Sequence, residues 1–147
     1  MPSMAADLSS ITRAVSRCVA RRPEIQAAYV FGSVASGRAR ADSDVDVAVL
    51  IDRRVPPGRI LKYRLKLMAD LGTALHRSDV DVVILNEASP LLAHRVLSQG
   101  TLVFERSAPA RVRFQTKTAS LYLDLIPIFE MHIRYLKRNV REGRIVG

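Results

Sequence analysis

The chain has 147 residues, which is enough for one compact domain with its own core and too few for two domains of ordinary size. Hydrophobic residues make up 48% of it, which excludes a wholly disordered chain, and no long uncharged apolar segment predicts a membrane span. The formal charge of +9, from 23 Lys and Arg against 14 Asp and Glu, is typical of proteins that contact RNA or an acidic protein surface.

Apolar periodicity predicts helices and strands that alternate along the chain. An amphipathic helix is expected over residues 7–20, where Arg22-Pro23 ends it. The elements expected after it are strands at 25–31 and 45–51, a loop at 53–58, a helix with an apolar face from Leu61 to Leu75, a strand at 80–85, a helix from Ser89-Pro90 to Gln99, a strand at 101–105 and a long helical segment at about 110–142, kinked at Pro127.

This order predicts an α/β (α+β) fold, in which a small mixed β-sheet is flanked by helices and followed by a long C-terminal helical segment. We expect a single domain over residues 1–147, with its core at about 25–105. The lone Cys18 cannot form an intramolecular disulfide, and no cleavable signal pattern is visible. A reducing, cytoplasmic location is therefore expected.

A turn of small residues and two alternating carboxylates lie between the first two strands. Gly32-Ser33 follows the strand at 25–31, and ten residues separate Ser33 from Asp44-Val45-Asp46. Asp44 and Asp46 share one face of a strand because alternate residues do, so both can reach one metal ion. Mg²⁺ prefers one or two carboxylates together with water and substrate phosphates. The pattern therefore predicts a site for a nucleotide and its metal.

A third carboxylate is expected from the next apolar run. Asp81 lies within the strand at 80–85, and Asp79 stands two residues earlier on the same face, so the two compete for this role. We favour Asp81 because it is set deeper in the apolar run. Asp42 is interpreted as a turn residue.

Other interpretations of this region fit less well. Gly32-x₄-Gly37-Arg38-Ala39 lacks the Lys and the Ser or Thr of a P-loop. An EF-hand loop starting at Asp42 would need Gly and Glu where the chain has Val47 and Arg53. A plain polar turn with Asp46 on a solvated face would explain Asp-x-Asp alone, but it does not explain the Gly-Ser turn and the third acid.

These residues resemble the signature of the polymerase-β-type nucleotidyltransferases, and within them the minimal nucleotidyltransferase (MNT) group. The resemblance covers residues 28–85 closely, and Tyr122-Leu123-Asp124 is similar to the closing helix of MNT proteins that are paired with HEPN toxins. It implies a polymerase-β-like fold, ATP as the nucleotide donor, and one or two Mg²⁺ ions. The implied metal-binding and catalytic residues are Asp44, Asp46 and Asp81, and the implied nucleotide-binding residues are Gly32, Ser33 and Arg38.

The resemblance further implies a Mg-dependent nucleotidyltransferase that acts as the antitoxin of a HEPN–MNT pair. Such an enzyme transfers AMP from ATP to a tyrosine of its cognate RNase toxin and forms a hetero-oligomer with it. One alternative is a non-catalytic antitoxin that neutralises the toxin by binding. Another is an RNA-binding or RNA-modifying nucleotidyltransferase, which the charge supports but no recognised RNA motif does. The long C-terminal helix carries more apolar surface than one small sheet covers, which predicts a protein partner or a homo-oligomer.

Overall fold

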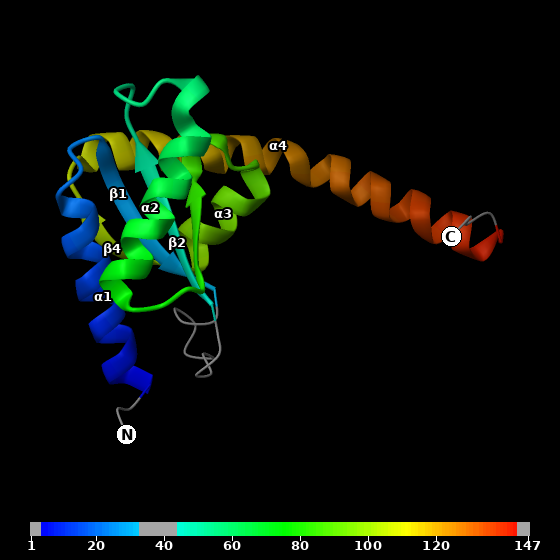
Figure 1. The fold of residues 1–147 in the computed structure, drawn as a ribbon. Helices are drawn as coiled ribbons and strands as arrows, with labels where there is room; N and C mark the ends of the chain where they lie inside the picture. The colour runs from blue at the N-terminus through cyan, green and yellow to red at the C-terminus, as the bar shows by residue number, and fades with distance from the viewer. Residues whose placement is uncertain (1–3, 33–43, 144–147) are drawn as a thin grey trace.

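The computed structural model of the chain describes residues 4–32 and 44–143 (Figure 1). Every helix and strand expected from the sequence is present. In chain order the elements are α1 (Met4–Ala20), β1 (Ile25–Phe31), β2 (Val45–Ile51), the 3₁₀ helix η1 (Pro57–Arg59), α2 (Ile60–Leu75), β3 (Val80–Ile84), the 3₁₀ helix η2 (Leu85–Glu87), α3 (Pro90–Gln99), β4 (Thr101–Glu105) and α4 (Ala108–Arg141).

The boundaries differ from the expected ones at a few ends. Helix α1 begins at Met4 and α4 begins at Ala108, each earlier than periodicity predicts. The hydroxyl of Ser107 accepts a hydrogen bond from the Ala110 backbone N–H at 3.2 Å, so the start of α4 is fixed by a capping residue ahead of the first apolar position. Strand β3 ends one residue early, because Leu85 begins the 3₁₀ helix η2.

The four strands form one mixed sheet in the order β3-β2-β1-β4. Strand β1 pairs antiparallel with β2 and with β4, whereas β2 pairs parallel with β3. The parallel pair needs a crossover connection, and α2 provides it across one face of the sheet. The predicted fold class is confirmed.

Helices cover both faces of the sheet, which explains why its central strands are apolar without alternation. Helices α1 and α2 pack on one face, where Val15 and Leu71 belong to the same core cluster as Val47. Helix α3 and the first part of α4 cover the other face, where Val96 lies in a cluster with Tyr29 and Ala48. The helices on both faces bury β1 and β2 along most of their length, so polar side chains are accommodated at the ends of these strands.

Helix α4 packs on the body only along its first part and then extends well beyond it (Figure 1). Thr118 is the one described side chain of this helix that is buried. Pro127 lies inside the helix, which continues on both sides of it. Within the described residues, no helix combines the length and the apolarity needed to cross a membrane.

Candidate functional site

The candidate site lies at the edge of the sheet that is formed by the ends of the strands, at their lower end in Figure 1. Strand β1 ends there at Phe31, and because β1 is antiparallel to β2, the start of β2 lies beside that end, where Phe31 pairs with Asp46. Strand β3 is parallel to β2 and starts at the same edge. Gly32, Asp44, Asp46 and Asp81 are therefore gathered from three strands that are adjacent in the sheet.

Asp46 and Asp81 are direct partners across the parallel pair β2 and β3. Val47 and Val82, the residues that follow them, both belong to the core beneath α1 and α2. Because neighbouring strand residues point to opposite faces, Asp46 and Asp81 share the face that α3 and α4 cover, and Asp44 starts on that face too. The predicted juxtaposition of acids on two strands is present in the structure.

The electrostatics agree with this proximity. Burial raises the pKa of the Asp46 carboxyl, and the nearby carboxylates of Asp81 and Asp44 raise it further. The Arg95 guanidinium, on α3, acts in the opposite direction. Like charges at close range disfavour joint ionisation, so a cation at this edge would favour the ionised carboxylates.

Gly32 brings bare backbone against this group of acids. Its φ is +79°, a conformation that favours glycine, and a Cβ added there would collide with Oδ2 of Asp46. A larger residue there would have a strained backbone, and the Asp46 side chain would have to move to make room for its Cβ. Gly32 therefore places backbone without a side chain beside the Asp46 carboxylate, as expected of the glycine in a Gly-Ser turn.

The structure distinguishes the two acids that competed for the third position. Asp79 accepts two hydrogen bonds from Arg77, at 2.8 Å from Nε and 2.7 Å from Nη2, and these bonds lower the pKa of its carboxyl. Asp81 stands opposite Asp46 instead. This arrangement supports Asp81 as the third carboxylate, which stays a prediction.

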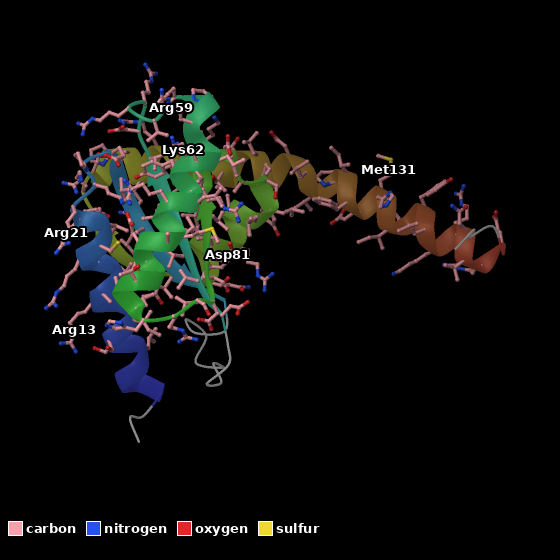
Figure 2. All side chains as sticks on the ribbon, in the orientation of Figure 1. Arg13, Arg21, Arg59, Lys62, Asp81 and Met131 are labelled. Atoms are coloured by element: carbon pink, nitrogen blue, oxygen red, sulfur yellow. The ribbon has the colours of Figure 1, made fainter. Side chains whose placement is uncertain are left out.

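Asp81 is held by an arginine that sequence reasoning missed. Arg64, on α2, donates from Nη2 to Oδ1 of Asp81 at 3.0 Å and from Nε to the carbonyl oxygen of Val82 at 2.6 Å. Figure 2 shows Asp81 near the lower part of α2. Arg64 lies in the second turn of α2 and belongs to no local motif, so only the packing of α2 beside β3 could reveal its role.

Arg95 is the second arginine that the sequence did not single out. It is exposed on α3, the helix that covers the face shared by the acids, and its charge acts on Asp46. Arg64 on α2 and Arg95 on α3 therefore supply positive charge on either side of the carboxylates. Guanidinium groups bind phosphate oxygens well. An arrangement of this kind suits a polyphosphate accompanied by a metal ion.

Within the part of the chain that the structure describes, no group of three or more His, Cys, Asp or Glu side chains is placed to hold a metal ion. The ion pair with Arg64 engages Asp81, which leaves Asp44 and Asp46 as the acids without a described partner. Ser33 and Arg38 lie outside the described residues, and their predicted roles in nucleotide binding stay predictions.

Comparison with known families agrees with this geometry. The family described as polymerase beta, nucleotidyltransferase, matches residues 14–109, which is more than half of the chain. The chain belongs to the polymerase beta nucleotidyltransferase family. This confirms the family that Gly32-Ser33 and Asp44-Val45-Asp46 predict, and with it the nucleotidyltransferase class.

Two relatives of this nucleotidyltransferase carry the same name, protein adenylyltransferase MntA. The chain is 35% identical to a protein adenylyltransferase MntA from Shewanella oneidensis over 103 residues, which cover 70% of each chain. It is 29% identical to a protein adenylyltransferase MntA from Aphanizomenon flos-aquae over 113 residues, covering 69% of this chain and 71% of the relative.

Solved structures show the same fold. A toxin-antitoxin structure with AMP-PNP gives a TM-score of 0.70 at 28% identity and covers 86% of this nucleotidyltransferase and 98% of that chain. A complex of a tri-AMPylated Shewanella oneidensis HEPN toxin with its MNT antitoxin gives a TM-score of 0.61 at 26% identity, covering 92% and 99%. The matched regions include part of α4 as well as the sheet.

Proposed function

We propose that this nucleotidyltransferase transfers AMP from ATP to a tyrosine of a cognate HEPN-type toxin and thereby acts as its antitoxin. The observation that carries the proposal is the pairing of Asp46 with Asp81 at the edge of the sheet, where the Gly32 backbone lies against the Asp46 carboxylate. The names of the relatives support protein adenylylation, and the AMP-PNP complex supports an adenine nucleotide as donor. We also propose the cytoplasm as its location, because ATP is available there and the chain has one cysteine.

The chemistry would proceed by positioning and charge neutralisation rather than by a covalent enzyme intermediate. The backbone at Gly32 and the Ser33 hydroxyl would hold the triphosphate against the edge of the sheet. The tyrosine oxygen attacks the α-phosphorus, a new P–O bond forms, and the bond to the bridging oxygen of the leaving pyrophosphate breaks. The carboxylate of Asp81 would accept the tyrosine proton.

The residues present fit a bound Mg²⁺. Asp44 and Asp46 offer hard oxygen ligands, and the pKa of Asp46 is raised first by burial and then by repulsion from Asp81 and Asp44, which a divalent cation would relieve. Bound there, the ion would neutralise the charge of the phosphates and of the leaving pyrophosphate. Because Arg64 pairs with Asp81, we propose Asp44 and Asp46 as the principal ligands and Asp81 as a further ligand or the proton acceptor.

The outer half of α4 supports a protein partner. From Leu121 onward most of its large apolar side chains are exposed, including Leu123, Met131 and Tyr135. Monomeric proteins rarely leave so large an apolar surface uncovered. The same surface favours the second candidate function, in which the chain neutralises its toxin by binding alone.

Co-expression with the product of the neighbouring gene, followed by intact-mass measurement of that partner, tests the proposal. We expect the partner to gain the mass of one or more AMP units, and we expect Asp44→Asn to abolish the gain while the complex still forms. A stable complex with no added mass would favour neutralisation by binding. An AMP gain that persists in both Asp44→Asn and Asp46→Asn would contradict the assigned site.

A further inference from the structure

The outer surface of α1 carries a row of three arginines. Arg13, Arg17 and Arg21 are spaced four residues apart, so they stand above one another on one side of the helix and its end. All three are exposed, and Figure 2 shows Arg13 and Arg21 pointing away from the sheet. A helix rises about 6 Å in four residues, so the row presents guanidinium groups at a regular spacing.

A second basic row begins α2, the helix packed beside α1. Arg59, Lys62 and Lys66 follow one another at spacings of three and four residues, and all three are exposed. Figure 2 shows Arg59 and Lys62 at the end of α2 that is remote from the candidate site. Six cations therefore lie on one helical layer, away from the acidic edge of the sheet.

None of these six cations has a carboxylate partner among the described residues. The acids nearby are already engaged: Asp70 pairs with Arg22, and Asp52 with Arg54. Glu24 accepts a hydrogen bond from the Tyr63 hydroxyl at 2.9 Å. The positive charge of this layer is therefore not neutralised by its own acidic residues.

Two hollows lie along the basic rows. The first, between α1 and α2, is lined by Arg17, Arg21 and Arg22 and by the Asp70 carboxylate that pairs with Arg22, among others. The second, at the start of α2, is lined by the cations Arg59, Lys62 and Lys66 and by Tyr63 with its partner Glu24, among others. The Arg22 guanidinium lies 5.4 Å from the centre of the Tyr63 ring, so one contact connects the walls of the two hollows.

We propose that this α1–α2 surface binds the sugar–phosphate backbone of a nucleic acid strand. Arginine forks and lysines in rows neutralise successive phosphates, and such contacts supply affinity without reading sequence. A membrane surface fits less well, because the large apolar side chains exposed on the described parts of these two helices are Leu61 and Leu65, neither of which is aromatic. RNA and DNA share the backbone chemistry, and the test distinguishes them.

The test measures fluorescence anisotropy of labelled strands of about 20 nucleotides, one of RNA and one of DNA, between about 50 and 200 mM salt. The unmodified protein is expected to bind with a steep salt dependence. The combined change Arg13→Gln, Arg17→Gln and Arg21→Gln should weaken binding about tenfold and reduce the salt slope by about 2, since each phosphate contact contributes about 0.7 for a single strand. Tighter binding of either strand supports the proposal and identifies the source.

A matched control removes three positive charges from α4, by Arg134→Gln, Lys137→Gln and Arg138→Gln, and should leave most of the binding intact. Circular dichroism melting verifies that both variants fold, and AMP transfer to the partner should persist in the α1 variant because its residues lie outside the candidate site. Equal weakening by the control would show that net charge alone is responsible and would overturn the proposal. So would binding to phosphatidylserine vesicles without binding to either strand.

Discussion

The edge of the sheet and the outer half of α4 both expose groups that do not favour folding of the isolated chain. At the edge, the charges of Asp44 and Asp81 act against the ionised form of Asp46, but the three acids stand at the start of β2 and β3, whose apolar residues belong to the buried core. Along the outer half of α4 the exposed groups are apolar, and no other element covers them among the described residues. The first region is a preorganised site on a rigid support, and the second is a surface whose stabilising contacts must come from another molecule.

The boundary between the packed and the unpacked parts of α4 is well defined. Phe114 and Thr118 pack against the body, and the Tyr122 ring stacks on His94 of α3 with centroids 3.7 Å apart and planes 4° from parallel. Beyond that stack, Leu123 is already 64% exposed. A long helix can persist without tertiary contacts, but beyond the Tyr122 stack the apolar side chains of α4 are not buried and so do not stabilise the isolated chain.

The largest expected effect concerns the acids at the edge. Asp81→Asn should lower AMP transfer by about 100- to 1,000-fold, because it removes charge at the position opposite Asp46. Asp79→Asn is the matched control two residues away, and it should retain activity within about fivefold, since Asp79 is engaged by Arg77. Intact mass of the partner after timed incubation with ATP gives both rates. The reverse ranking would assign the third carboxylate to Asp79.

The second prediction compares one leucine from each side of the boundary. Leu71 is fully buried between α2 and the sheet, so Leu71→Ala should lower the free energy of unfolding by about 2–5 kcal/mol. Leu123→Ala should change it by less than about 0.5 kcal/mol while weakening the complex with the partner. Urea unfolding of the isolated chain measures both. A large loss for Leu123→Ala would mean that copies of this chain cover the outer half of α4.

The third prediction concerns the glycine at the edge. Gly32→Ala should lower AMP transfer about tenfold and destabilise the fold by about 1–3 kcal/mol, because the new Cβ meets Asp46 and the backbone needs a positive φ. Gly58→Ala is the control, since a Cβ there would have no heavy atom within 4 Å. Initial rates and melting temperatures of the two variants should differ clearly. Full activity of Gly32→Ala would show that the backbone at this position tolerates a side chain and that the Asp46 carboxylate can move aside without loss of function.

Much of the sheet could be predicted from the sequence because β1 and β2 are buried on both faces. Their apolar runs at 25–31 and 45–51 match the structure to the residue. The same reasoning placed Asp44 and Asp46 on one face, since side-chain alternation in a strand does not depend on the rest of the fold. The combination of Gly32-Ser33 with Asp44-Val45-Asp46 then predicted the site, because a plain polar turn before a strand does not explain both motifs together.

The rest of the site depends on contacts between distant segments, which local patterns do not report. Arg64 reaches Asp81 only because α2 lies beside the edge strand β3, and Arg95 faces Asp46 only because α3 covers that face. The choice between Asp79 and Asp81 needed the register of β2 with β3. Depth in an apolar run favoured Asp81 but could not show that Arg77 engages Asp79.

The smallest expected effect concerns how much the ionised Asp46 carboxylate, beside Asp44 and Asp81, lowers the free energy of unfolding. Burial and the neighbouring carboxylates raise the folded-state pKa of Asp46 above its ordinary value of 3.8. Between the unfolded and folded values the folded state binds more protons, so this group makes stability fall as pH rises. The cost is complete above the folded-state pKa and absent below 3.8.

Asp46→Asn should therefore stabilise the metal-free chain at neutral pH, by no more than about 1 kcal/mol because water screens a half-exposed group. The gain should vanish below pH 3.8, where the wild-type carboxyl is protonated in both states. Asp52→Asn, at the other end of β2, should have the opposite sign at neutral pH, because Asp52 accepts hydrogen bonds from Gln26 and from the Arg54 backbone. Melting curves of both variants across pH in a metal chelator measure this. If Asp46→Asn destabilises the chain as much as Asp52→Asn does, then the Asp46 carboxylate stabilises the fold, and the close approach of the three acids does not destabilise the metal-free chain.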